Sequence, residues 1–454
     1  MELEKIKSKT MGMILKFSIP SIIAMVLTSF ITVADGFFIG NYIGKEGIAA
    51  VNLGLPVIYL FLAAGLLVSV GGAALAGMAF GAGELKKSNQ IFHQTVATTV
   101  VFAILTAIFV FIFFEPMLDI LRAAGQVREH FQVYYKIMLP GLVIMLVNSS
   151  MGMFIRADGS PGYYMKLSIM SVIINIFLDY IFVGPMHLGI AGVAAASLLA
   201  EALSLICSVW FFWKRSKVYR FEYFSTCGFG GKISFDTKLL KHTLCNGSSE
   251  FIGELSVGIA MFAYNFVIMR CIGVDGVTAF TIVGYVAYVF SMVIVGFGQG
   301  ASPLMSYCYG AGERHLAGRI RRCTSTLVFA VGAVTFLLMT PLSGWYGSLF
   351  VKSAAVQDMI CSGMVIFMLS FFFSGVNVIT SFYFTATGRA GQSAVISLSR
   401  GLVVLLVCIF VLPVYLGMAG IWMAAPVTET VTLAISVWCL MREQMRKEKK
   451  YKVN

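Results

Sequence analysis

The chain has 454 residues, of which 59% are hydrophobic and only 12% charged, and its formal net charge is +12. Water-soluble proteins carry about 25% charged residues, so this composition excludes a soluble enzyme and makes lipid the main solvent of the chain. The positive charge does not indicate nucleic-acid binding, because the basic residues are spread over alternate loops and do not gather in one domain.

Apolar stretches follow one another along the whole chain, and each is close to the about 20 residues that cross a membrane as a helix. They leave little chain for a domain outside the membrane. The first stretch is too long for the core of a signal peptide, so we expect it to be a retained span. The predicted spans are residues 14–39, 52–79, 92–114, 131–155, 165–184, 189–213, 242–270, 280–308, 323–343, 358–384, 393–412 and 418–440.

The positions of the basic residues predict how the chain is oriented. Nearly all of the 33 Lys and Arg residues lie in one alternate set of connections between the spans. Basic residues in short loops are retained on the cytoplasmic side of the membrane. We therefore expect a multi-pass protein of the bacterial cytoplasmic membrane with both termini in the cytoplasm. Among the basic residues, Arg400 alone is assigned to the interior of a span, because the others lie in connections or close to the ends of the predicted spans.

An internal repeat divides the chain into two halves. At an offset of about 229 residues the sequence GAGE at 81–84 recurs at 310–313, and at about 228 residues Glu201 falls on Glu429. Two halves of six spans each insert in the same orientation and are related by an axis along the membrane normal. The prediction is an all-α fold of two pseudo-symmetric six-helix bundles. Its segments are an amino-terminal lobe at 1–213, a linker at 214–241, a carboxyl-terminal lobe at 242–441 and a basic tail at 442–454.

Ionisable side chains inside spans are costly and therefore mark candidate sites. Asp35 in the first span and Asp179 in the fifth lie at similar depth, and Asn175 precedes Asp179 by one helical turn. Ser197 in the sixth span returns to a comparable depth. These oxygens suit a sodium ion, and the two carboxylates equally suit a shared proton. The alternative is that the two acids only cap local breaks in the helices or bond neighbouring backbone.

A second set of ionisable residues belongs mainly to the other half. Glu250 and Glu254 stand one turn apart in the seventh span, and Glu429 lies deep in the twelfth. Arg400 is a candidate counter-ion for one of them. Glu429 and its repeat partner Glu201 could either contact substrate or bond across helices to hold each bundle. Acids that face a water-filled cleft would attract cationic compounds.

Aromatic residues and Met can line an adaptable apolar pocket, and the chain has 38 Phe and 25 Met. The candidates for substrate contact are Tyr264, Tyr285, Tyr288 and Phe154. Proline within a span can kink the helix and supply the bending of a rocking carrier. The prolines within predicted spans include Pro20, Pro56, Pro140, Pro303 and Pro426.

Several motifs of other classes are missing from the sequence. It holds no Walker loop, no paired-Cys metal motif and no His-Glu-His zinc motif. Gly296, Gly298 and Gly300 lie inside an apolar span with no strand before them, so they indicate close helix packing and not dinucleotide binding. We therefore expect no cofactor and no enzymatic activity. The only other component that we expect the protein to need is a coupling ion.

Three segments carry a resemblance to a known family: FSIPSIIAMVLTSFITVADGFFIGNYIGKEGIAAVNLGLPV at 17–57, the two GAGE turns, and the two-half layout. Together they resemble the multidrug and toxic-compound extrusion (MATE) family over essentially the whole chain. NGSSEFIGELS at 246–256 and PVTET at 426–430 are similar to its MepA-like bacterial branch. The resemblance implies a V-shaped twelve-helix fold that exports organic cations in exchange for Na⁺ or H⁺.

The resemblance also implies roles for individual residues. Asp35 matches the family's first-helix acid, and Asn175 and Asp179 match its fifth-helix Asn and Asp. Ser197 stands where a Thr is usual and keeps the hydroxyl group.

In the second half, Glu250 or Glu254 matches a seventh-helix acid of many relatives. A tenth-helix acid found in some relatives is absent, with Asn377 in its neighbourhood. The alternatives to drug export are a flippase for a lipid-linked oligosaccharide or lipid, which would need more basic residues in its cavity than Arg400, and an integral-membrane lipid enzyme. A complete pathway within one chain makes a monomer sufficient.

Overall fold

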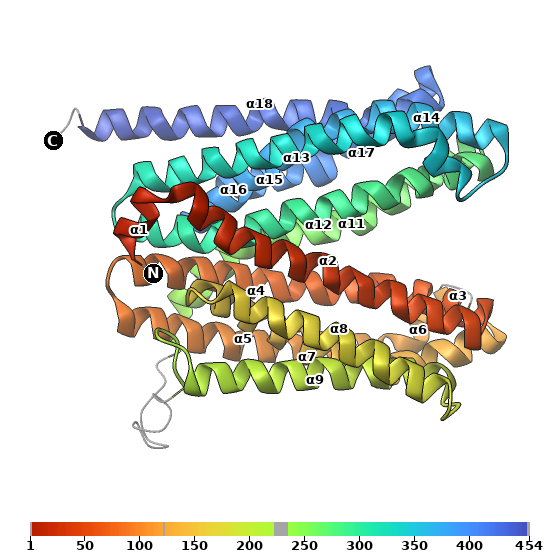
Figure 1. Ribbon diagram of the computed structural model, residues 1–454, viewed down its shortest axis with the longest axis horizontal. Helices are drawn as coiled ribbons and strands as arrows, with labels where there is room; N and C mark the ends of the chain where they lie inside the picture. The colour runs from red at the N-terminus through yellow and green to blue at the C-terminus, as the bar shows by residue number, and fades with distance from the viewer. Residues whose placement is uncertain (1, 121–122, 222–234, 452–454) are drawn as a thin grey trace.

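The chain folds mainly into long helices whose axes are roughly aligned with the long axis of the molecule, as Figure 1 shows. The computed structural model describes residues 2–120, 123–221 and 235–451, without the side chains of 120 and 446–451. The middle of the predicted linker, 222–234, lies outside the described residues, and so does the end of the predicted tail. A backbone in lipid must satisfy its own hydrogen bonds, and continuous helices do so.

The first half contributes α1 to α9. Their bounds are α1 Leu3–Ser8, α2 Thr10–Tyr42, α3 Lys45–Leu53, α4 Leu55–Gly81, α5 Leu85–Ile112, α6 Phe114–Ile120, α7 Gly125–Ala157, α8 Pro161–Val183 and α9 Gly189–Lys214.

The second half contributes α11 to α18, with a 3₁₀ turn and a π-helical turn inside two of its spans. Their bounds are α11 Thr237–Cys271, α12 Val274–Gly310, α13 Arg314–Ser348, α14 Ala354–Phe367, η1 Met368–Ser370, α15 Phe371–Ala386, α16 Ala390–Leu398, η2 Ser399–Val403, α17 Val404–Leu416 and α18 Met418–Tyr451.

The predicted number of spans is confirmed, because 12 helical segments are long and apolar enough to cross a membrane. Most run past the predicted limits, since polar and charged residues continue the helices beyond the hydrocarbon. The last helix, α18, continues to Tyr451, well into the predicted tail. One expectation is wrong: Pro56 occupies the first turn of α4, where proline fits without breaking a hydrogen bond. It therefore does not kink that span.

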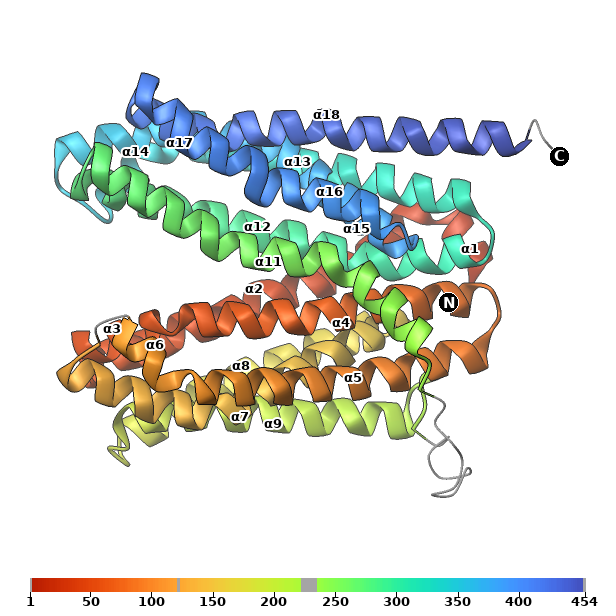
Figure 2. The same cartoon turned by 180° about the vertical axis from the view of Figure 1, so that it is seen from behind.

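The two six-helix bundles lie side by side, as predicted. In Figure 2 the first bundle, coloured red to yellow-green, fills the lower half and the second bundle fills the upper half. Helix α1 and the last turns of α18 lie at the same end of the molecule as the turn that joins α4 to α5. We call this end the GAGE end. The domain limits at 213 and 242 stay a prediction.

The repeated GAGE turns have the same backbone structure in both halves. Gly83 and Gly312 adopt φ angles of 80° and 83°, which glycine reaches without the penalty of a side chain. In each turn the amide of the following Glu donates to a carbonyl in the last turn of the helix, Glu84 to Ala79 and Glu313 to Cys308, both at 2.9 Å. This is the Schellman end of a helix. The repeat seen in the sequence is therefore a repeat of structure.

The bundles touch closely at the GAGE end. A Cβ atom at Gly81 would lie 2.0 Å from the carbonyl oxygen of Tyr307, and one at Gly310 would lie 1.9 Å from that of Met78. These glycines are equivalent in the repeat, so α4 and α12 approach each other symmetrically. Small residues allow such close approach of membrane helices. We call this contact the glycine seam.

Candidate functional site

The four predicted ion-site residues come together inside the first bundle. Asp35 lies on α2, Asn175 and Asp179 lie on α8, and Ser197 lies on α9. The Asn175 amide donates to Ser197 Oγ at 3.1 Å and to Asp35 Oδ1 at 3.4 Å, and the Ser197 hydroxyl donates to Asp35 Oδ2 at 3.2 Å. All four are buried, and Asn175 and Asp179 have no exposed surface.

This cluster is rich in acceptors and poor in donors. Among the described residues, both carboxylate oxygens of Asp179 and the side-chain oxygen of Asn175 are buried without a hydrogen-bond donor. The Asp179 carboxyl also interacts with that of Asp35. Buried acceptors without donors lose the solvation they have in water, and two facing carboxylates repel each other. A proton shared by the carboxyls, or a cation among the oxygens, would remove both penalties.

Sequence reasoning missed one neighbour of this cluster. Tyr134 on α7 is 3% exposed and lies within electrostatic range of both Asp35 and Asp179. Its hydroxyl is a group that can donate to a carboxylate. A tyrosine in an apolar span carries no signal in a single sequence, so only the packing of α7 shows its place.

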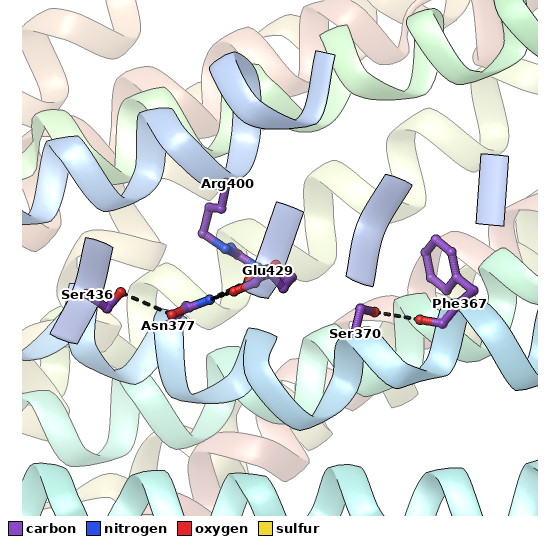
Figure 3. Close-up of polar contacts among 6 residues, drawn as sticks. All are labelled: Phe367, Ser370, Asn377, Arg400, Glu429 and Ser436. Atoms are coloured by element: carbon purple, nitrogen blue, oxygen red, sulfur yellow. Dashed lines mark hydrogen bonds and ion pairs between the residues drawn. The ribbon is translucent and has the colours of Figure 1, made fainter. Parts of the chain in front are cut away.

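The second bundle contains a network of four polar residues, shown in Figure 3. Arg400 donates to Glu429 Oε1 at 2.8 Å and Asn377 donates to Glu429 Oε2 at 2.8 Å. The Ser436 hydroxyl donates to Asn377 Oδ1 at 3.0 Å. Arg400 lies in the π-helical turn Ser399–Val403, a feature that often marks functional sites in helices. Arg400 is therefore the counter-ion of Glu429.

The first bundle holds the counterpart of this network. Asn148 donates to Glu201 Oε2 at 2.9 Å and accepts from the Ser208 hydroxyl at 2.8 Å. The repeat offset places these three residues on Asn377, Glu429 and Ser436. Among the described residues no basic side chain pairs with Glu201. The shared Asn-Glu-Ser hydrogen bonds link helices within each bundle. This supports the interpretation that they hold the helices of each bundle to one another.

Glu250 and Glu254 lie on α11, the helix of the second bundle that packs along α4 of the first. Glu250 is half-buried and lies within electrostatic range of Glu254 and Arg400. Glu254 lies near Tyr288 on α12 and near Tyr59 on α4. Tyr59 was not among the candidates predicted from the sequence. The two glutamates therefore stand where the bundles face each other.

The predicted aromatic contacts separate into two groups. Tyr285 and Tyr288 are about half exposed, at 53% and 48%, so they are available to a ligand or to lipid. Tyr264 is buried, stacks on Phe280 with 4.5 Å between ring centroids and lies near Glu429. Phe154 has no exposed surface and packs against Phe92. It is a core residue, and we remove it from the substrate candidates.

One basic residue is more deeply buried than the sequence indicates. Arg156 directly follows the predicted span 131–155, so the sequence places it in a connection between spans. It lies in the last turn of α7 and is 2% exposed, with its guanidinium 4.5 Å from the centre of the Tyr164 ring. A basic residue at the predicted edge of a span looks topogenic in the sequence, and only the packing of the helix end shows that it is buried.

Twelve helices long and apolar enough to cross a membrane, in two pseudo-symmetric bundles with buried acids in both, are typical of a polytopic membrane transporter. A family model described as MatE matches residues 20–181 and 251–410, one block in each half. The chain belongs to this family, that of the MATE multidrug efflux transporters, which are transporters and not enzymes.

The chain is similar to proteins of several bacteria. It is 23% identical to the multidrug export protein MepA of Staphylococcus haemolyticus, over 93% of this chain and 91% of that protein. It is 22% identical to an FAD transporter of Shewanella oneidensis, over 91% of each. Among solved structures, the outward-facing conformation of a multidrug resistance MATE family transporter matches with a TM-score of 0.89 and 21% identity, over 96% of both chains. The twelve-helix MATE fold is thereby confirmed.

Proposed function

We propose that the chain is a secondary active exporter of organic cations that works by antiport with Na⁺ or H⁺ in the bacterial cytoplasmic membrane. In this proposal the GAGE end faces the cytoplasm and a single chain suffices. The observation that carries the proposal is the set of donor-free oxygens of Asp179 and Asn175 beside Asp35. Such a set favours a positive charge, whether the ion is a proton or sodium.

The proposed cycle is alternating access. The ion enters from the outer side and neutralises the pair of Asp35 and Asp179, which favours rearrangement of the first bundle and release of the organic cation outward. The glycine seam then opens, and the ion leaves to the cytoplasm. Exchange of one coupling ion for one singly charged cation moves no net charge, so the concentration gradient of the ion drives export. Each tenfold gradient of the ion, about 1.4 kcal/mol, supports about a tenfold gradient of the organic cation. One coupling ion is enough for useful export.

The organic cation is proposed to bind where the bundles face each other. Glu250 and Glu254 supply negative charge there, with Tyr288 and Tyr285 as aromatic surfaces that attract cations. Their places on α11 and α12 support this assignment. We propose that four other candidates stabilise the helix packing within the bundles and do not bind substrate directly: Glu201, Glu429, Arg400 and Tyr264.

The test is ethidium transport in proteoliposomes under an imposed sodium gradient and, separately, an imposed pH gradient. One gradient should drive transport, and Asp35→Asn should abolish it while the protein still inserts and purifies. Cys408→Ser, at the position equivalent to Asp179 in the second half, is the matched control and should keep the activity. Transport that responds to neither gradient would contradict antiport and favour the flippase alternative.

A further inference from the structure

Within the described part of the chain, Arg156 is a buried cation without an acidic partner. It is 2% exposed, and among the described residues its Nη1 atom is buried with no hydrogen-bond acceptor. Its neighbour is Tyr164, whose ring lies 4.5 Å from the guanidinium carbon and whose hydroxyl also contacts the guanidinium, without removing its charge. Arginine stays protonated in proteins, and an unpaired charge inside a protein costs several kcal/mol. A partner that is not part of the described chain would remove this cost.

Arg156 lines a small cavity of about 30 Å³ between the two bundles. Its walls come from α4 and α7 of the first bundle and from α12 and α15 of the second. They include Val70, Gln299, Ser302, Ser306 and Phe382. No Asp or Glu is among the described lining residues. A water needs about 10–15 Å³ of such space, so the cavity of about 30 Å³ has room for about two waters or for one ion the size of chloride.

The other polar groups of the cavity can complete an anion site. Ser302 has a hydroxyl that can donate a hydrogen bond. The side-chain oxygen of Gln299 is buried without a donor, and the amide oxygen and nitrogen exchange places by a flip, which turns the NH₂ group towards an anion. Ser306 is already engaged, since its hydroxyl donates to the Pro303 carbonyl at 3.2 Å. The groups still available, together with the Arg156 charge, suit an anion and repel a cation.

We propose that a small monovalent anion of chloride size binds between Arg156, Ser302 and Gln299 and holds the two bundles together at the GAGE end. Because both bundles supply walls, the complete site exists only while they are closed there. A ligand that binds one conformation better than another shifts the population towards it. The anion therefore stabilises the closed state, separately from the coupling ion at Asp35.

The test is the thermal unfolding of the purified full-length protein in detergent, in potassium chloride and in potassium gluconate at equal ionic strength. Chloride should raise the melting temperature in a saturable way by roughly 2–4 °C, and bromide should act similarly. Sulfate, which is larger, should give no saturable shift, but only the gradual rise that comes from its exclusion from protein surfaces. The shift should vanish in Arg156→Gln, persist in Arg156→Lys, and persist in Lys7→Gln, which removes an exposed positive charge at the same end.

If Arg156→Gln does not fold, Ser302→Ala keeps the charge and should raise the chloride concentration needed for half of the shift. Bromide soaked into crystals should give an anomalous peak beside Arg156. Equal melting temperatures in chloride and gluconate for the unchanged protein, or a full chloride shift in Arg156→Gln, would overturn the proposal. The readout is stability and not transport, so its outcome is separate from that of the antiport test.

Discussion

The two halves of the molecule share one buried network and differ in another. The same hydrogen bonds between an Asn, a Glu and a Ser occur in both bundles. They join Asn148, Glu201 and Ser208 in the first bundle, and Asn377, Glu429 and Ser436 in the second. The acid pair of the first bundle has no such copy. The repeat offset places Tyr264 and Cys408 where Asp35 and Asp179 stand in the first half.

The tyrosine and the cysteine still face each other. Tyr264 lies within electrostatic range of Cys408, as Asp35 does of Asp179. Both halves therefore retain the contact between equivalent helices, while only the first retains two carboxylates there. In the second bundle the added charge is Arg400, which neutralises Glu429. The comparison teaches that the shared bonds build the bundles, and that the unshared acids carry the ion chemistry.

The largest effect is expected where the halves differ most. Asp179→Asn should reduce gradient-driven ethidium transport to the level of empty liposomes, because the amide cannot take a proton and adds no negative charge for a cation. Cys408→Ser at the equivalent position should stay within about twofold of the unchanged protein, since a buried Cys packs as a small apolar residue. Equal losses in the two variants, measured as initial rates at matched protein content, would remove the distinction between the halves.

The next effect concerns a feature that the halves share. Gly81→Leu and Gly310→Leu should each lower transport at least about tenfold, because the side chain would collide with backbone across the glycine seam. The losses should be similar, as the two contacts are equivalent. Gly318→Leu on α13 is the control, since a Cβ there meets no atom within 4 Å. Cysteine cross-linking across the seam would show whether closure is lost, and unimpaired closure would contradict this account.

A smaller effect separates the two glutamates. Glu429→Gln should destabilise the protein by roughly 1–3 kcal/mol, below the usual loss for a broken buried pair, because Arg400 is 32% exposed. Glu201→Gln keeps an acceptor for Asn148 and should cost about 1 kcal/mol or less. Melting temperatures in detergent compare the two variants. Adding Arg400→Met to Glu429→Gln should recover part of the loss, and no recovery would mean that the charge pairing is not the cause.

The smallest effect is expected at the surface of the GAGE end. Lys7 on α1 bonds Glu313 of the second half at 2.8 Å, and this bond raises the pKa of the Lys7 ammonium. A raised pKa gives stability that is present below the ordinary pKa of lysine and is lost as pH rises through the higher value. Lys7→Gln should therefore change the melting temperature little near pH 7, with any difference shrinking in high salt. A large change at pH 7 would assign α1 a greater role.

Much of the fold was predictable because its signals are local or periodic. Apolar length gives the spans, and the GAGE recurrence gives the two halves. At the first site, Asp35, Asn175 and Asp179 stood out because polar residues in spans are rare. The pairing of Arg400 with Glu429 was one of three that the sequence allowed, because Glu250 and Glu254 were the other candidate partners of Arg400.

The rest depends on how helices pack, which a single sequence does not contain. Tyr134 joins the acid site only because α7 turns that side chain towards α2 and α8. Arg156 looked like a loop residue because helix α7 extends beyond the apolar stretch. Pro56 looked like a kink because the predicted span begins at residue 52, ahead of the actual start of α4 at Leu55. In each case the missing information is the end or the rotation of a helix.

The most direct test of the central claim reverses the antiport. An ethidium gradient imposed across proteoliposomes should drive an opposite flux of H⁺ or Na⁺, followed with a trapped pH dye or with radioactive sodium, because coupling between two ligands is reciprocal. The account predicts this counter-flux for the unchanged protein and for Cys408→Ser, and its loss in Asp35→Asn and Asp179→Asn. Ethidium movement with no counter-flux, or a counter-flux that survives in Asp35→Asn, would contradict it.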